Sequence, residues 1–394
     1  MKSSPTPTAL SRAQYFGLFL AVFAAAAGTQ ALVSLHPQLE AEYDIDVVSA
    51  RGLTAVYTIG YGVAGLLLGP LAARFGKARL LRRMLVVFAI ANAVLFCGPP
   101  LWAFYALRLL SGAAAGALFA SLQVVIADAV PFERRGRALA IVMAGSFVAA
   151  ILVLWASTRL SRFGVFSVFA LIAVCALFSF ALAPRRSSGG AEPARVGAAA
   201  LSRDRRVLAA LGVTALNTLA AFAVIGSFAG HLDQQFAVTP AQKETFFLVL
   251  GLASLPGVFL AATLSDRLGK RRSVAIALAA SLALSPALVA TDSFQAFVVC
   301  GGVLAACSAL RQGPFAALLT QLVDSRQRPR LLGWNGFASG IGIALGQLLG
   351  GFAHERGGFL AAVTVSAVAL VGSLVLLLQV RVDESPKRVL PAGG

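Results

Sequence analysis

The apolar residues of this chain fall into long runs, and short segments with charges, proline or glycine separate one run from the next. A helix needs roughly 20 apolar residues to cross the ~30 Å hydrocarbon layer of a membrane. The pattern therefore predicts an all-α integral membrane protein with twelve transmembrane helices. We expect these helices at residues 13–35, 52–73, 80–97, 101–127, 138–159, 163–183, 207–230, 244–265, 273–291, 294–322, 331–353 and 358–380.

The composition agrees with a membrane protein. Of the 394 residues, 58% are hydrophobic and 12% are charged, and the mean hydropathy is +0.83. No soluble globular domain of this length has such a composition. The formal net charge of +17 would suggest a nucleic-acid partner in a soluble protein. Here the basic residues lie in short loops between apolar runs, so we expect no nucleic-acid partner.

Lysine and arginine are concentrated in alternate loops. They gather in both terminal segments and in the loops at 74–83, 128–137, 184–206, 266–272 and 324–330. The other loops carry Arg51, Arg159, Arg162, Lys243 and Arg356. Short loops rich in lysine and arginine stay on the cytoplasmic side of a membrane. The pattern therefore predicts a multi-pass protein of the cell (inner) membrane with both termini in the cytoplasm.

One short basic loop occurs twice. Residues 69–79 (GPLAARFGKAR) return in altered form as residues 262–272 (ATLSDRLGKRR), and each copy separates two apolar runs. A repeat at half-chain spacing predicts a protein of two similar halves. The polar and basic segment 184–206 is typical of a linker. We therefore expect an N-terminal six-helix half at 1–183, a cytoplasmic linker at 184–206 and a C-terminal six-helix half at 207–394.

The repeated loop resembles the motif GxLaDRxGRK of the major facilitator superfamily, and the likeness extends over essentially the whole chain. The first copy has Ala73 where the motif has aspartate, whereas the second copy keeps Asp266. In that family the loop links neighbouring helices on the cytoplasmic face of the outward-open state, so the resemblance implies a weaker link in the first half. The candidate gating and coupling residues are Gly69, Arg74, Gly76, Lys77, Asp128, Asp266, Arg267, Gly269, Lys270 and Asp324.

Two further segments point to a branch of that family. Residues 107–119, with Arg108 and Gly112, are similar to the RxxxG signature of drug:proton antiporters. Residues 131–145 resemble the arabinose-type sugar and nucleoside efflux permeases. The glycine- and proline-rich run that such antiporters carry in helix 5 is missing, and a glycine run occurs instead at 340–351. The resemblance implies proton-coupled efflux, and the missing run leaves export and import both open.

Arg311 is the most informative single residue. It precedes Asp324 at the inner helix end by enough residues to lie roughly 20 Å away, near mid-membrane. An arginine at the centre of a membrane helix raises the free energy of membrane insertion by about 2.5–3.5 kcal/mol, so its side chain must face water, carbonyl groups or a ligand. Residues 312–314 (Gln-Gly-Pro) predict a helix break beside it, and transporters place substrates at such breaks. The alternative is a structural arginine that bonds to the carbonyl groups freed by the break.

The remaining candidates are polar residues within or near the spans. Arg108 lies roughly 10 Å from the outer end of its helix, within reach of the interface by snorkelling, and the motif gives it a coupling role. Because no acidic residue lies deep in a span, a proton site would have to lie at a helix end, at Asp128, Asp324, His36, His231 or Asp233. The candidate cavity residues are Arg311, Gln312, Arg108, Gln30, Tyr61, Asn217 and Asn335. For each of these, a hydrogen bond between helices is the structural alternative.

These patterns favour a secondary active transporter. We expect efflux of a small sugar-, nucleoside- or drug-like solute by proton-coupled antiport with alternating access. A second hypothesis is uptake of an organic anion with Arg311 as counter-charge, and a third is a membrane sensor or scaffold. We expect neither an enzyme nor a cofactor or metal site, because no nucleophile-base pair, metal-ligand cluster or phosphate loop is present. The expected form is a monomer in the lipid bilayer.

Overall fold

The computed structural model describes residues 10–32, 35–45, 47–185, 203–324 and 327–380. Within these residues all regular structure is helical. The first half contains α1 (Arg12–Gln30), α2 (His36–Tyr43), α3 (Val47–Phe75), α4 (Lys77–Phe96), α5 (Leu101–Ala129), α6 (Phe132–Leu160), η1 (Ser161–Phe163) and α7 (Ser167–Leu182). The sequence did not predict α2 or η1, and most of the expected linker lies outside the described residues.

The second half follows the same plan. It contains α9 (Arg205–Phe236), α10 (Pro240–Leu268), α11 (Lys270–Val289), α12 (Phe294–Leu310), α13 (Gln312–Gln321) and α14 (Arg328–Gln379). The long α14 holds the last two expected spans, because the backbone of Gly357 and Gly358 is not helical. In the described residues, six helices are by themselves long and apolar enough to cross a membrane. The expected all-helical architecture of twelve spans in two halves is confirmed.

Local sequence explains where several helices begin. Thr239 accepts a hydrogen bond from the backbone N–H of Gln242, whose side chain bonds back to Thr239, and Pro240 occupies the first turn of α10. This reciprocal capping satisfies N–H groups that a helix start otherwise leaves unpaired. Gly76 and Gly269 occupy matching places in the repeated loops and have φ values of 79° and 86°. Glycine adopts such a conformation without strain, so both loops make the same tight connection between helices.

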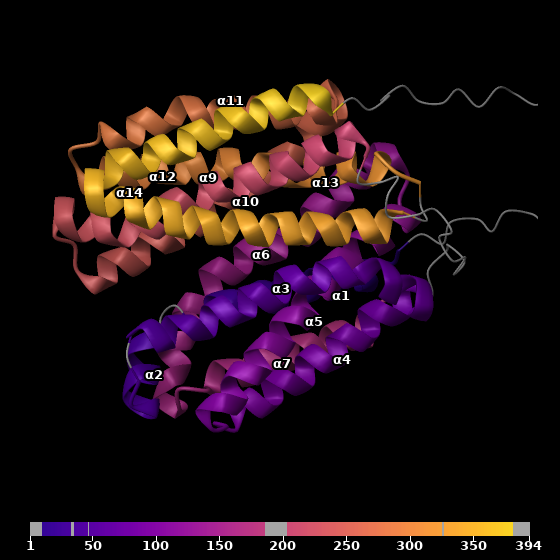
Figure 1. The fold of residues 1–394 in the computed structure, drawn as a ribbon, viewed down its shortest axis with the longest axis horizontal. Helices are drawn as coiled ribbons and strands as arrows, with labels where there is room; N and C mark the ends of the chain where they lie inside the picture. Colours follow the sequence, from indigo (N-terminus) through magenta and orange to yellow (C-terminus); the bar gives the residue numbers. More distant parts are fainter. Residues whose placement is uncertain (1–9, 33–34, 46, 186–202, 325–326, 381–394) are drawn as a thin grey trace, which may run out of the picture.

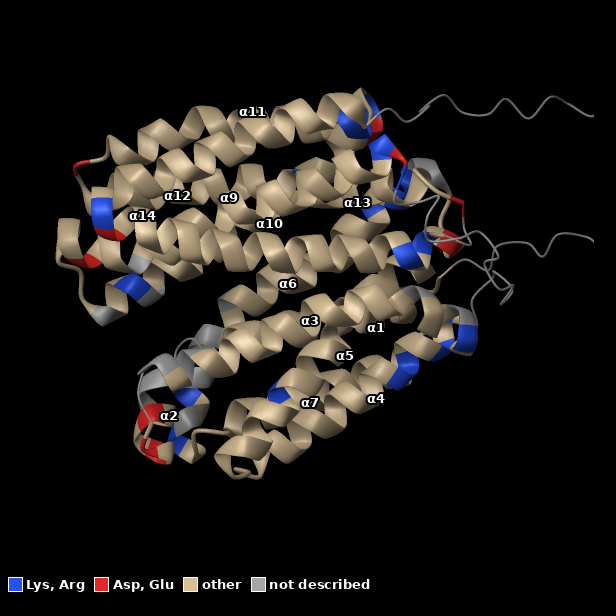
Figure 2. Ribbon diagram, in the orientation of Figure 1, with Lys and Arg blue, Asp and Glu red and all other residues tan. Residues whose placement is uncertain are grey.

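The helices form two bundles that lie side by side (Figure 1). Contacts between the bundles come mainly from α3 with α14, α6 with α10 and α13, and α5 with α14. Most described lysine and arginine residues lie at one end, where α1 and α4 begin and α10 ends (Figure 2). We call this the basic end. The middle sections of the helices are almost free of charge, as expected for segments inside a hydrocarbon layer.

The two halves touch backbone to backbone where α3 meets α14. A Cβ atom added to Gly65 would collide with the carbonyl group of Gly333, and one added to Gly333 would collide with the carbonyl group of Gly65. The hydrophobic effect does not drive helices together inside a membrane, because the lipid tails are as apolar as the side chains. Membrane helices associate instead through close packing of this kind. The pair therefore sets the distance between the halves.

The glycine run at 340–351 has a different role. Gly342, Gly346 and Gly350 recur every fourth residue along α14 and lie against the backbone of α9 in the same half. Residues four apart lie on one face of a helix. The run thus joins two helices within the second half.

Replacing Gly333 with alanine should separate the halves. The added methyl group meets the Gly65 backbone, and overpacking of this kind costs about 1–3 kcal/mol. Gly333→Ala should therefore lower the thermal midpoint of the purified protein. Gly336→Ala is the matched control, because an added Cβ there meets nothing within 4 Å and alanine is the better helix former. Equal midpoints for the two variants would contradict the close contact.

Candidate functional site

A cavity of about 370 Å³ lies between the two halves. This volume is within the range of small-molecule sites. The first half contributes side chains from α3, α5 and α6, and the second half contributes side chains from all six of its helices. The lining residues of the first half are Tyr61, Phe119, Gln123, Met143 and Phe147. Because both halves form its walls, any relative movement of the halves changes its shape.

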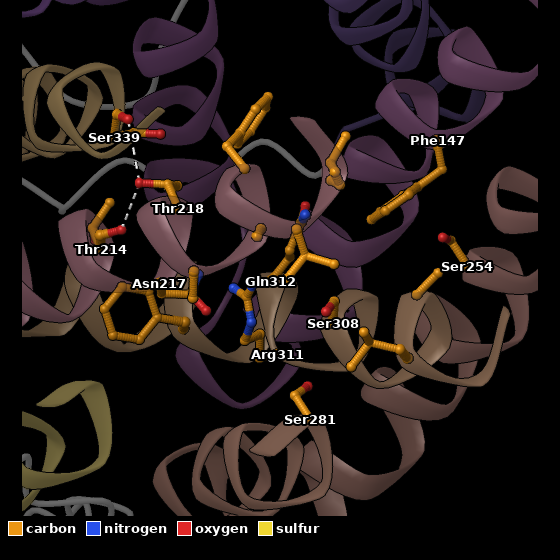
Figure 3. A pocket seen from close by; sticks show the side chains of 18 of the residues that line it. Phe147, Thr214, Asn217, Thr218, Ser254, Ser281, Ser308, Arg311, Gln312 and Ser339 are labelled. Carbon is orange, nitrogen blue, oxygen red and sulfur yellow. Dashed lines mark hydrogen bonds between the residues drawn. The ribbon is translucent and has the colours of Figure 1, made fainter. Parts of the chain in front are cut away.

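Arg311 occupies the break between α12 and α13 and points into the cavity (Figure 3). The backbone N–H of Phe315 bonds to the Arg311 carbonyl at 2.9 Å, so the helix resumes directly after the break. Among the described lining residues Arg311 is the only charged one. Its guanidinium forms no hydrogen bond or ion pair within the described chain. Its charge therefore remains available to a molecule in the cavity.

The cavity also holds amide oxygens without partners. In the described structure, the buried Asn217 Oδ1 and Gln123 Oε1 atoms accept no hydrogen bond. A buried acceptor left unpaired costs about 1–3 kcal/mol. Asn335 differs, because its Oδ1 atom accepts a bond of 2.5 Å from the Thr214 hydroxyl. Asn217 and Gln123 therefore remain open to a hydrogen-bond donor, whereas Asn335 is held in place.

The structure brings together five of the seven expected cavity residues, Arg311, Gln312, Tyr61, Asn217 and Asn335. Arg108 and Gln30 do not line the cavity. Sequence reasoning missed serine hydroxyl groups of the second half, including Ser281 and Ser285. These two donate to carbonyl groups one turn earlier at 2.9 and 2.8 Å, which makes serine compatible with a membrane span. Their four-residue spacing was the signal that could have revealed a shared polar face.

Arg108 lies inside the first half and does not reach the membrane interface as expected. Its side chain is fully buried, and its Nη1 and Nε atoms donate to the carbonyl groups of Gly28 (2.9 Å) and Leu53 (3.3 Å). The guanidinium also lies 4.3 Å from the ring centre of Tyr57. Carbonyl oxygens and an aromatic face replace water around the charge, so Arg108 can remain buried and joins α1, α3 and α5.

A cluster of charged side chains links the halves at the basic end. The Asp128 carboxylate at the end of α5 bonds to Lys77 at 2.6 Å and to Arg328 at 3.0 Å. Its side chain is only 6% exposed. Arg328 belongs to the second half, and Arg135 of the first half also crosses the interface to the Thr320 hydroxyl at 3.1 Å. These contacts hold the halves together at this end.

The expectation that the loop of the first half lacks an acidic partner is wrong. Asp128 supplies the negative charge that Ala73 does not, because the end of α5 lies next to Lys77. Asp266 is exposed and takes part in no ion pair among the described residues. Arg328 was not among the predicted residues, since nothing in the sequence shows which cation of the loop at 324–330 faces α5.

The other gating candidates have varied surroundings. Arg74 and Arg267 are exposed, and Lys270 is buried. Gly69 lies inside α3, while the Asp324 main-chain carbonyl accepts the N–H groups at the start of α14. The candidates therefore do not form a single cluster.

His231 lies near the end of α9 that is remote from the basic end. Its ring stacks on Phe359 with centroids 4.0 Å apart. Burial, and to a smaller extent the nearby His354, lower the pKa of His231 below 6.5. Asp233, another expected proton site, pairs with Lys243 at 2.5 Å. The side chain of His36 lies outside the described part of the structure.

Comparison with known protein families accounts for this architecture. Residues 18–215 and again residues 210–394 match the sequence model of the Major Facilitator Superfamily. The chain belongs to the Major Facilitator Superfamily. Each match covers about one half of this transporter, in agreement with a fold of two similar bundles.

Two bacterial relatives match a large part of this transporter. It is 29% identical over 259 residues to the chloramphenicol resistance protein of Streptomyces lividans, a match covering 63% of this chain and 66% of that protein. It is 23% identical over 370 residues to the MFS-type transporter YtbD of Bacillus subtilis (strain 168), covering 91% and 93%.

Solved structures share the fold at low identity. The human organic anion transporter MFSD10 (TETRAN) has a TM-score of 0.78 and 16% identity, covering 93% of this chain and 99% of that one. The proton:xylose symporter XylE, bound to 6-bromo-6-deoxy-D-glucose, has a TM-score of 0.75 and 14% identity, covering 93% and 94%. At these identities the likeness establishes the fold of the transporter and nothing about its substrate.

Asp128→Asn should weaken the link between the halves. Without the carboxylate, Lys77 and Arg328 keep their charges at one site, and loss of one partner from a buried ion pair costs about 3 kcal/mol or more. The purified variant should have a clearly lower thermal midpoint. Asp233→Asn is the control, because it removes the half-exposed partner of Lys243. It should lower the free energy of unfolding by no more than about 1 kcal/mol. Equal losses in the two variants would contradict the importance of the Asp128 cluster.

His231→Phe should reduce the sensitivity of the transporter to acid. The pKa of His231 is lowered in the folded state, so the unfolded chain binds more protons and stability falls as the pH drops through and below about 6.5. Phenylalanine keeps the ring stack on Phe359 and removes the titration. The difference in thermal midpoint between pH 7.5 and pH 5.5 should shrink in the variant; an unchanged difference would show that His231 is not its source.

Proposed function

We propose that this transporter exports a small organic solute in exchange for protons, by alternating access around the central cavity. The observation that carries this proposal is the cavity itself, which both halves line and which places an unpaired cation at a helix break. Substrate sites of transporters with two repeats lie at such breaks between the halves. The aromatic side chains Phe119, Phe147 and Phe315 offer apolar surface to the carbon skeleton of the solute.

The chemistry of the cavity defines the class of solute. Arg311 donates hydrogen bonds, so it favours a carbonyl, hydroxyl or acidic group. Asn217 and Gln123 have unpaired oxygen atoms, so they favour a hydroxyl or N–H group. A drug-, nucleoside- or sugar-like molecule with both kinds of group satisfies these requirements.

The distribution of basic residues supports an orientation of the transporter in the membrane. We place the basic end in the cytoplasm of the cell (inner) membrane, because basic residues stay on that side. Both termini are then cytoplasmic. Residues 1–183 and 207–394 move as two bodies joined by the linker at 184–206, and the transporter acts as a monomer.

Export and proton exchange are supported by two resemblances. The segment around Arg108 and Gly112 is similar to drug:proton antiporters, and one relative is named as a chloramphenicol resistance protein. Because the described lining of the cavity contains no carboxylate, we place the proton site at a helix end. Asp128 is the best candidate, since its protonation removes the charge that attracts Arg328 and so releases the basic end.

Uptake of an organic anion is the second candidate function. It rests on the same unpaired cation, Arg311, together with the lack of any acidic side chain among the described lining residues. A structural neighbour is named as an organic anion transporter. In this case Arg311 acts as the counter-charge of the transported anion.

Replacement of Arg311 tests both candidates. Loss of a hydrogen bond from a charged group costs about 1.5–3 kcal/mol, or roughly 10- to 150-fold in affinity, so Arg311→Gln should nearly abolish transport at low solute concentration. Chloramphenicol and benzoate are suitable probes of a neutral and an anionic solute. Arg205→Gln is the control, because Arg205 is exposed, lies outside the cavity and is not among the gating and coupling candidates.

The assay measures uptake into everted vesicles with and without an imposed pH gradient. Export in exchange for protons predicts accumulation that depends on an acidic vesicle interior and fails in Arg311→Gln. Benzoate transport in the opposite direction would favour the anion-uptake function. Full transport of every carried solute by Arg311→Gln would contradict both.

A further inference from the structure

A second, separate groove lies at the basic end of the first half, on the side formed by α3, α4 and α7. It has a volume of about 580 Å³ and shares no lining residue with the central cavity. Four arginines line it, Arg79, Arg82, Arg83 and Arg185, and no acidic residue is among its described lining residues. Figure 2 shows basic residues along the part of α4 nearest the basic end. The groove is therefore strongly positive and open to an anion.

Two of these arginines are held in place by aromatic rings, and one of the two also by the end of α7. The guanidinium of Arg82 lies 4.1 Å from the ring centre of Phe180 and donates to the Phe180 and Ala183 carbonyl groups at 3.0 and 3.2 Å. That of Arg83 lies 4.3 Å from the ring centre of Phe75. Fixed guanidinium planes lose less freedom when they bind an anion. None of the four arginines forms an ion pair within the described residues.

The depth of the groove matches the headgroup layer of a membrane. Arg79, Arg82 and Arg83 lie within the first two turns of α4, so they are within roughly 10 Å of its start. Headgroup regions are about 5–8 Å thick on each side of the hydrocarbon layer. Val86 and Val87 continue the same groove toward the middle of the helix. A charged headgroup thus meets the arginines while its hydrocarbon chain follows the apolar part.

Comparison with the second half shows that Arg82 and Arg83 are not needed to keep the start of a helix on the cytoplasmic side. Alignment of residues 69–79 with 262–272 places Arg82 and Arg83 opposite Ala275 and Ile276 of α11. The second copy keeps a basic loop, which is enough to anchor a helix end on the cytoplasmic side. The first half therefore places two cations further along its helix, at positions where the second half has apolar residues.

We propose that the groove formed by α3, α4 and α7 binds one anionic phospholipid, with its phosphate on Arg79, Arg82 and Arg83 and its acyl chain along Val86 and Val87. Basic pockets between membrane helices on the cytoplasmic side recognise such headgroups. The proposal requires only that the chain spans a membrane and is independent of the substrate and direction of transport. A lipid in this place joins α3 to α7 from outside the first bundle.

Native mass spectrometry of the purified full-length protein tests the proposal. The probe is dioleoylphosphatidylglycerol, with dioleoylphosphatidylcholine as the zwitterionic comparison. Each arginine near an anionic lipid contributes about fivefold, so Arg79→Gln with Arg83→Gln should weaken phosphatidylglycerol binding by about 25-fold. Phosphatidylcholine should bind wild type weakly and the variant equally weakly. Inorganic phosphate should not displace the lipid, because it lacks an acyl chain.

The matched control is Arg267→Gln with Arg272→Gln, which removes two exposed arginines from the equivalent loop of the second half. This control should bind phosphatidylglycerol as well as wild type does. An unchanged affinity of the Arg79/Arg83 variant, an equal loss in the control, or equal binding of both lipids would overturn the proposal. If the double variant elutes as an unfolded protein, Arg79→Gln alone serves, because Arg79 is exposed; it should lose about fivefold, and no loss would overturn the proposal.

Discussion

A guanidinium inside a hydrocarbon layer keeps its charge and must be surrounded by polar groups. This constraint distinguishes Arg108 from Arg311, two arginines inside predicted membrane spans. Arg108 is held by two carbonyl oxygens and the face of Tyr57, although its Nη2 atom has no hydrogen-bond partner among the described residues, so it serves as a strut of the first half. Arg311 has no such partners in the described structure and faces a cavity. The same residue type is structural in one half and free to bind a solute in the other.

The contacts between the halves are unevenly distributed along the membrane normal. Backbone contact at Gly65 and Gly333 brings α3 against α14, and the ion pairs of Asp128 lie beyond it at the basic end. A close backbone contact cannot be stretched gradually, because packing falls off steeply with distance. The backbone contact and the ion pairs therefore both hold the two halves together toward the basic end.

Sequence patterns alone predicted the spans, the two halves and the break at Arg311, because hydrophobic run length, charge bias and Gly-Pro chemistry act locally along the chain. They did not predict which side chains meet across the interface. Arg328 reaches Asp128 only because two distant helix ends coincide in space. The sequence did not show that Arg108 is enclosed within the first half, since its carbonyl partners at Gly28 and Leu53 lie on other helices. The cavity serines were not predicted, because single serines are common among the small residues of apolar membrane helices.

The most direct test uses a single cysteine in the cavity wall. Ser308 lines the cavity near Arg311, so Ser308→Cys, made after replacement of the four native cysteines, places a reactive thiol there. A membrane-impermeant maleimide is then added to right-side-out and to everted vesicles, and the labelling rate is measured. Alternating access predicts labelling from both sides of the membrane and loss of transport once the label is attached. Labelling from one side alone in vesicles that still transport would contradict a cavity that opens alternately to the two sides.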